Sequence, residues 1–230
     1  IGDLLGSLKN KNDVAKNDLP KILKSLYSST ARGEIKAYAE AKNNVNIPWH
    51  HLSFYATGVP GDFWRNLSIS DVTGGFIARA LLFSLDLLAP FPREEVVIDP
   101  PPQLVEAIRK LNRIERRHQG NLMTSPAPRM VLKTREAKEA FTSWHRGCHE
   151  LQNEHRHNPD GRAAIYARAA ENTQKLALIP AVSLAGGPPE NVPLESVRFA
   201  AGLMDGMIPR LVVQMAANIS HNEQDALRKR

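Results

Sequence analysis

The sequence has almost no cysteine and no long apolar run. Cys148 is the only cysteine among the 230 residues, so no disulfide bond can form within the chain. A single free thiol suits the reducing cytosol, and we therefore expect a cytoplasmic location. No apolar stretch approaches the about 20 residues that cross a bilayer, and the first residues form no secretory signal, so we expect no membrane partner.

Several familiar catalytic motifs are missing too. The chain lacks the G-x-x-x-x-G-K-[ST] loop that cradles a triphosphate, and it lacks the G-x-S-x-G turn of α/β-hydrolases. His149 and His155 do not have the i, i+4 spacing of a zinc protease. We expect no metal site, although a wider histidine and cysteine group is an alternative. Its members are His145, Cys148, His149, His155 and His157.

The composition is that of a soluble globular protein with a basic balance. Hydrophobic residues make up 42% of the chain and charged residues 23%, which is ordinary for a folded domain. The length of 230 residues allows one large domain or two small ones. The net charge of +6 and the pI of about 9.5 make nucleic acid a candidate partner.

The stretch from Leu52 to Phe83 organises the rest of the chain. The apolar run from Leu52 to Ala56 predicts a short buried strand that ends at Thr57. The segment 76–83 is apolar except for Arg79, whose charge is costly to bury without a partner. Between these two segments we expect a short helix over 62–67 and a polar loop over 68–75.

The pattern predicts an α/β fold whose second part is mainly helical. We expect a mixed region over 1–90, a proline-rich connection over 91–102 and a helical subdomain over 103–230. In helix 103–118 the apolar residues Leu104, Ile108 and Leu111 should face inward. We also expect helices over 1–30, 135–157 and 161–179, the last ended by Pro180, and a final helix that begins at about 194. The remaining expected elements are a hairpin or short helix over 34–50, a strand over 130–132 and a loop over 185–193.

Two arginines have both a functional and an ordinary interpretation. Arg79 could reach a nucleotide bound elsewhere and stabilise charge on the transferred phosphoryl group, or it could pair locally with Asp71 or Asp86. Arg168 could likewise reach a phosphate from the helical part. Its ordinary interpretation is an exposed ion pair with Glu171, one turn away and close to Lys175.

A basic surface and a methionine-rich helix suggest two further functions. The chain could be a non-catalytic module that binds nucleic acid, or the basic residues could simply be solvated. The residues of this surface are Lys36, Lys42, Arg109, Arg113 and Arg116. The last helix could form an oligomer or scaffold contact, although an ordinary core position is the alternative for its apolar residues. They are Met204, Met207, Ile208, Leu211 and Met215.

Three blocks of the sequence are similar to a known family. HLSFYATGVPGDFWRNLSISDVTGGFIARALLFS resembles the second half of the NTPase module in phage- and plasmid-type primase–helicase proteins, an uncharacterised-domain family related to RecA/AAA+ replicative helicases. YARAAENTQKLALIPAVS (Tyr166 to Ser183) resembles a second block of that family. IGDLLGSLKNKN followed by LPKILKSLYSS resembles the segment after its Walker B acidic pair.

The resemblance implies an incomplete P-loop NTPase core followed by a helical subdomain. In the family the P-loop and Walker B carboxylates lie upstream of the position at which this sequence starts, so this chain alone should bind no ATP or Mg²⁺ tightly and should be inactive. By position, Thr57 resembles a strand-end sensor, Arg79 an arginine finger that acts in trans, and Arg168 a second sensor. For the full-length protein the resemblance implies ATP, Mg²⁺, DNA and assembly into a homo-oligomeric ring.

Overall fold

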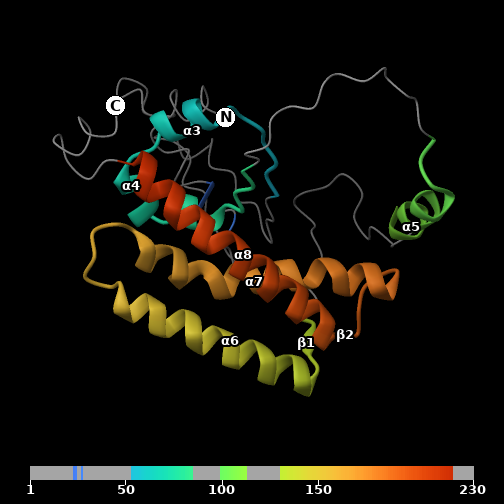
Figure 1. Cartoon of the computed structure of the whole chain (residues 1–230). Helices are drawn as coiled ribbons and strands as arrows, with labels where there is room; N and C mark the ends of the chain where they lie inside the picture. Colours follow the sequence, from blue (N-terminus) through green and yellow to red (C-terminus); the bar gives the residue numbers. More distant parts are fainter. Residues whose placement is uncertain (1–22, 25–26, 28–52, 85–98, 113–129, 220–230) are drawn as a thin grey trace, which may run out of the picture.

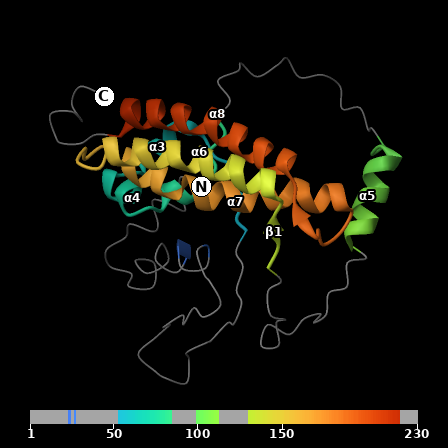
Figure 2. The same cartoon turned by 90° about the horizontal axis from the view of Figure 1, so that it is seen from below.

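The computed structural model describes residues 23, 24, 27, 53–84, 99–112 and 130–219. Its body is a bundle of three long helices, which lie alongside one another in Figures 1 and 2. They are α6 (Arg135–Glu154), α7 (Arg162–Ala185) and α8 (Leu194–Asn218). Each of the three packs against the other two.

Local sequence explains how these helices begin and which side they bury. The hydroxyl of Thr134 accepts a hydrogen bond from the amide of Ala137 at 3.3 Å, which caps α6. Phe141 and Cys148 are buried on α6, about one and three turns after Ala137 on the same face. α8 buries the apolar face that its spacing predicts, and the ordinary core interpretation therefore holds for the following residues. They are Val197, Met204, Ile208, Leu211 and Met215.

A small parallel sheet closes one end of the bundle. β1 (Leu132–Lys133) pairs with β2 (Asn191–Val192), with Leu132 opposite Asn191 and Lys133 opposite Val192. β1 lies almost where a strand was predicted, shifted toward the C-terminus. β2 falls inside the predicted loop over 185–193. Within the described residues this pair is the whole sheet, so the α/β description holds only in this limited sense and no P-loop core is visible.

Short helices cover the bundle near the start of α7. They are α3 (Pro60–Arg65), α4 (Ile69–Thr73) and the 3₁₀ turn η2 (Ile77–Arg79). α4 and η2 pack on α7. Gly161 lets α4 approach closely: its φ is +80°, and a Cβ there would lie 2.5 Å from Cγ1 of Val72.

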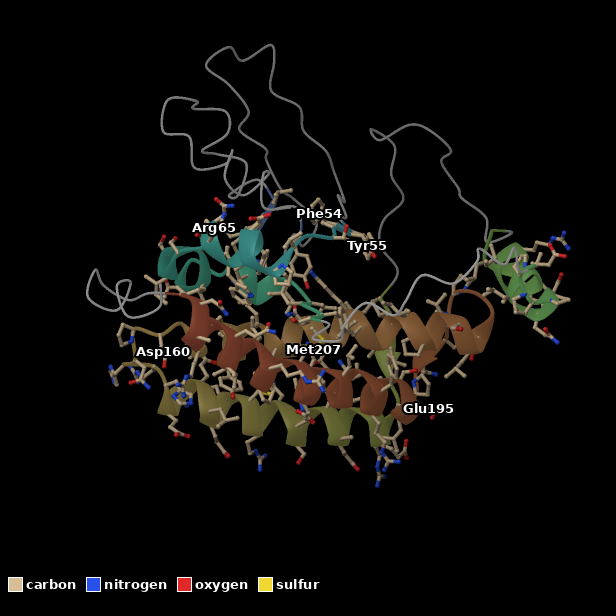
Figure 3. All side chains as sticks on the ribbon, turned by 45° about the horizontal axis from the view of Figure 1, so that its top comes forward. Phe54, Tyr55, Arg65, Asp160, Glu195 and Met207 are labelled. Atoms are coloured by element: carbon tan, nitrogen blue, oxygen red, sulfur yellow. The ribbon has the colours of Figure 1, made fainter. Side chains whose placement is uncertain are left out.

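Three predictions about these segments are wrong. Residues 53–59 form no strand and are exposed, with Phe54 at 60% and Tyr55 at 89%, because no neighbouring strand in the described structure accepts their backbone hydrogen bonds. Figure 3 shows both aromatic residues at the edge away from α6. The predicted loop over 68–75 contains α4, which Ser68 and Asp71 start with a capping box. α7 continues through Pro180, because residues beyond it, such as Ala181 at 2% exposure, still pack in the core.

α5 (Pro102–Asn112) differs most from its prediction. Leu104, Ile108 and Leu111 were expected to face inward, but they are 52%, 49% and 38% exposed. The helix shares no extensive contact with another described element, and it stands apart from the bundle in Figures 1 and 2. The predicted helix over 1–30 lies outside the described residues apart from 23, 24 and 27, and the predicted hairpin over 34–50 lies outside them entirely.

Candidate anion-binding site

A group of charged side chains gathers where η2 meets the first half of α7. Arg168, Glu171 and Lys175 follow one another at i, i+3 and i+7, which places them on one face of α7. Asn172 lies beside them and is 3% exposed. We call Arg79, Arg168, Glu171 and Lys175 the basic cluster.

Asn172 holds three separate segments together at this point. Its Nδ2 donates a hydrogen bond to the backbone oxygen of Ala78 in η2 at 3.0 Å. Its Oδ1 accepts a hydrogen bond from the hydroxyl of Tyr27 at 2.6 Å. A buried amide with both ends bonded fixes its neighbours, so η2 is held against α7 next to the basic cluster.

Glu171 is the carboxylate of the basic cluster, and two cations already share it. Arg168 Nη1 lies 3.0 Å from Oε2, and Lys175 Nζ lies 3.0 Å from Oε1. Burial alone would raise the pKa of Glu171, but the hydrogen bonds and charges of Lys175 and Arg168 outweigh burial and lower it. Glu171 is therefore ionised at neutral pH. The ordinary interpretation of Arg168 as an ion-pair partner is confirmed.

Arg79 belongs to η2, which packs on α7. Its Nη1 donates to the backbone oxygen of Gly75 at 2.5 Å. Gly75 has φ +73°, and a Cβ there would lie 2.8 Å from that same nitrogen, so glycine is required. Burial lowers the pKa of Arg79, and the positive charge of Arg168 lowers it further, while Glu171 raises it.

Tyr27 and Lys175 complete the wall of the cluster. Lys175 Nζ lies 3.3 Å from the centre of the Tyr27 ring and also donates to the Tyr27 backbone oxygen. Burial, followed by the charge of Glu171, raises the pKa of the Tyr27 hydroxyl to about 12. That hydroxyl therefore stays protonated at neutral pH. At the rim, Lys24 Nζ donates to the backbone oxygen of Gly74 at 3.1 Å.

The arrangement favours binding of an anion over acid–base chemistry. In the described part of the cluster, three cations surround one carboxylate, and Lys24 adds a fourth nearby. Guanidinium and ammonium groups attract oxyanions such as phosphate. Tyr27 is too weak an acid, and Glu171 too firmly paired, to exchange protons near neutral pH.

The other predicted site residues lie elsewhere or outside the described structure. Thr57 is exposed, and the strand that should end at it is absent. Arg109 is exposed on α5. The residues outside the described part are Lys36, Lys42, Asp86, Arg113 and Arg116. The Asp71 carboxylate accepts from the amide of Ser68 at 2.8 Å, as part of the α4 capping box.

The histidine-rich part of α6 does not form a metal site in the described residues, where no three histidine, cysteine or acidic side chains converge. His149 contacts Asn153, and the ring of His155 stacks on Tyr166 with centroids 6.1 Å apart. Cys148 is buried, and burial together with the charge of Asp205 raises its pKa to about 11.

Sequence reasoning missed three residues of the site. Asn172 carried a signal, because it is a polar residue between Arg168 and Lys175 on the inner side of an alanine-rich helix. Tyr27 and Lys24 carried none, since their contacts depend on tertiary structure.

Comparisons of the chain with known proteins found no relative. No protein-family model, no curated protein and no solved structure matches the chain. Among the described helices, none has the length and apolar character needed to span a membrane.

Proposed function

We propose that this chain is part of an ATP-dependent DNA helicase of the primase–helicase type, and that its basic cluster contacts the phosphates of a nucleotide held by other residues. The resemblance assigned a finger role to Arg79 and a sensor role to Arg168 from separate blocks of sequence. The observation that supports the proposal is that η2, which carries Arg79, packs on α7, which carries Arg168, so that the charge of Arg168 acts on Arg79. A bound phosphate group would be attracted by both positive charges.

The residues present fit a polyphosphate better than a complete active site. The cluster offers cationic donors that could neutralise charge on a phosphoryl group. Within the described residues no group of acidic side chains is placed to hold Mg²⁺. In this proposal, ATP and Mg²⁺ are bound by the full-length protein. That protein acts on DNA in the cytoplasm as a homo-oligomeric ring. Thr57 keeps the role of a strand-end sensor only if that ring orders its segment.

The test measures binding of inorganic tripolyphosphate to the full 230-residue chain by calorimetry. We expect weak binding that falls with salt, because exposed phosphate contacts are screened. The double variant R79Q/R168Q should abolish it, while R146Q/R198Q removes two exposed arginines of α6 and α8 and should leave it unchanged. Equal binding by both double variants contradicts the proposal, and so does measurable ATP hydrolysis by the chain alone.

A non-catalytic nucleic-acid-binding module is the second candidate, and the exposure of α5 favours it. Arg109 and Lys110 are exposed on the side of this helix opposite its apolar residues. Single-stranded DNA should then bind with an affinity that falls steeply with salt, and R109Q/K110Q should reduce the slope by about 1–2 units. A flat salt response rules this function out.

A further inference from the structure

The outer side of α8 has an apolar surface that the described chain does not cover. α8 lies at the outside of the bundle, in front of α7 in Figure 1. Phe199 is 57% exposed and Val213 is 67% exposed. Gly202 and Gly206 lie between them on the same side, since the spacings of three, four and seven residues return to one face of a helix. We call these four residues the outer stripe.

The two glycines are not needed by the fold of the single chain. A Cβ built at Gly202 or at Gly206 would meet nothing within 4 Å, and neither residue has a positive φ. Glycine inside a helix costs about 1 kcal/mol relative to alanine. Two such costs on one exposed face suggest that another backbone approaches there.

The outer stripe is complementary to itself. Consider a second α8 that runs antiparallel across the first, with a two-fold axis between Gly202 and Leu203. Phe199 and Gly206 lie equally far from this axis, so each phenyl ring faces the glycine of the other copy. In this arrangement each Phe199 side chain packs over a Gly206 that has no side chain. This contact occurs twice, as two-fold symmetry requires.

The charges beside the outer stripe follow the same symmetry. Glu195 and Arg210 also lie equally far from the axis, so each carboxylate faces the guanidinium of the other copy. Both residues are exposed, and neither forms an ion pair with another residue in the described structure. Figure 3 shows Glu195 at the start of α8, at the edge of the molecule.

We propose that two copies of this chain associate through α8, antiparallel, with Phe199 over Gly206 and Glu195 opposite Arg210 in both directions. The inference does not depend on the proposed helicase function, since it concerns the side of α8 that faces away from the buried core. Four residues of the methionine-rich face of α8 are not available for such contact because they are buried in the core. They are Met204, Ile208, Leu211 and Met215.

The first test is the mass of the full chain in solution as a function of concentration, by sedimentation velocity. We expect a reversible monomer–dimer equilibrium. G206L fills the position opposite Phe199 and should weaken the dimer at least about tenfold while raising helix propensity. G147L is the matched control, because a Cβ at Gly147 on α6 also meets nothing within 4 Å. A monomer at every concentration overturns the proposal, as does equal association of both variants.

The second test exchanges the charges. E195R and R210E should each weaken the dimer about tenfold, because each places like charges together at two symmetric positions. The double variant E195R/R210E should restore association. The two residues are about 22 Å apart within one helix, so rescue requires the other copy. Absence of rescue overturns the proposal. So does a dimer that is lost only in L104D/I108D, which assigns the contact to α5.

Discussion

Replacing Glu171 by glutamine removes the carboxylate that Arg168 and Lys175 share. Both pairs measure 3.0 Å, and the side chains are 26% to 39% exposed, so solvent screens them in part. Each such pair contributes up to about 1 kcal/mol, and without the carboxylate the three cations repel one another. We expect E171Q to lower the free energy of unfolding by about 1–2 kcal/mol, and Tm by about 3–6 °C.

The assay is thermal unfolding at low salt with and without inorganic tripolyphosphate. The anion should raise Tm more in E171Q than in the wild type, because it replaces the missing negative charge. E139Q is the control: Glu139 pairs with Arg135 at 3.2 Å on α6, with side chains 66% and 85% exposed, so its loss should cost no more than about 0.5 kcal/mol. Equal Tm for E171Q and E139Q, or no added response to tripolyphosphate, refutes the reasoning.

The same variant gives a pH signature. The pKa of Glu171 lies below its usual value in the folded protein, because Lys175 and Arg168 outweigh burial. A lowered folded pKa contributes stability that is present above the unfolded pKa and is lost as pH falls through the folded pKa. The difference in stability between the wild type and E171Q should therefore be complete at neutral pH, begin to shrink near the ordinary glutamate pKa of about 4.3, and disappear only once the pH falls below the folded pKa. A difference that persists unchanged in acid assigns the effect to packing.

Three further predictions concern the surroundings of the basic cluster. N172A leaves the hydroxyl of Tyr27 without its acceptor and should cost about 2–3 kcal/mol in urea unfolding; a cost under about 0.5 kcal/mol contradicts the bridging role. G161A places a Cβ against Val72 at positive φ and should cost about 2 kcal/mol or more, measured the same way; wild-type stability argues against this close contact. The Cys148 thiol, with its pKa raised to about 11, should react with iodoacetamide only after unfolding; fast labelling of the native chain contradicts its burial.

The long helices could be predicted because each carries a continuous apolar face. Phe141 and Cys148 on α6, and Ile208 and Met215 on α8, are buried at the spacing that the sequence shows. The prediction failed where local signals compete with tertiary structure. Pro180 suggested the end of a helix, yet core contacts beyond it extend α7.

The segment before α3 failed for a related reason. An apolar run such as 52–56 indicates a preference for burial, but it does not determine which strand the segment would pair with. Without a neighbouring strand in the described structure, residues 53–59 form no strand and are exposed. The capping box of α4 was readable, because Ser68 and Asp71 have the spacing of an N-terminal cap.

The site could be predicted only in part. The common face of Arg168, Glu171 and Lys175 follows from helical periodicity alone. The approach of η2 does not, because the hydrogen bond from Asn172 to Ala78 joins residues 94 positions apart. No local pattern encodes a contact of that separation.

The two interpretations of Arg168 turn out to be compatible. An ion pair between Arg168 and Glu171 exists, Lys175 shares the same carboxylate, and the charge of Glu171 also acts on Arg79. A carboxylate in such a place keeps the cations from repelling one another before an anion arrives, so its presence is no argument against phosphate binding. What separates a structural cluster from a phosphate site is therefore the response to an added anion. That response should be larger when Glu171 is neutral, and a purely structural cluster predicts no such difference.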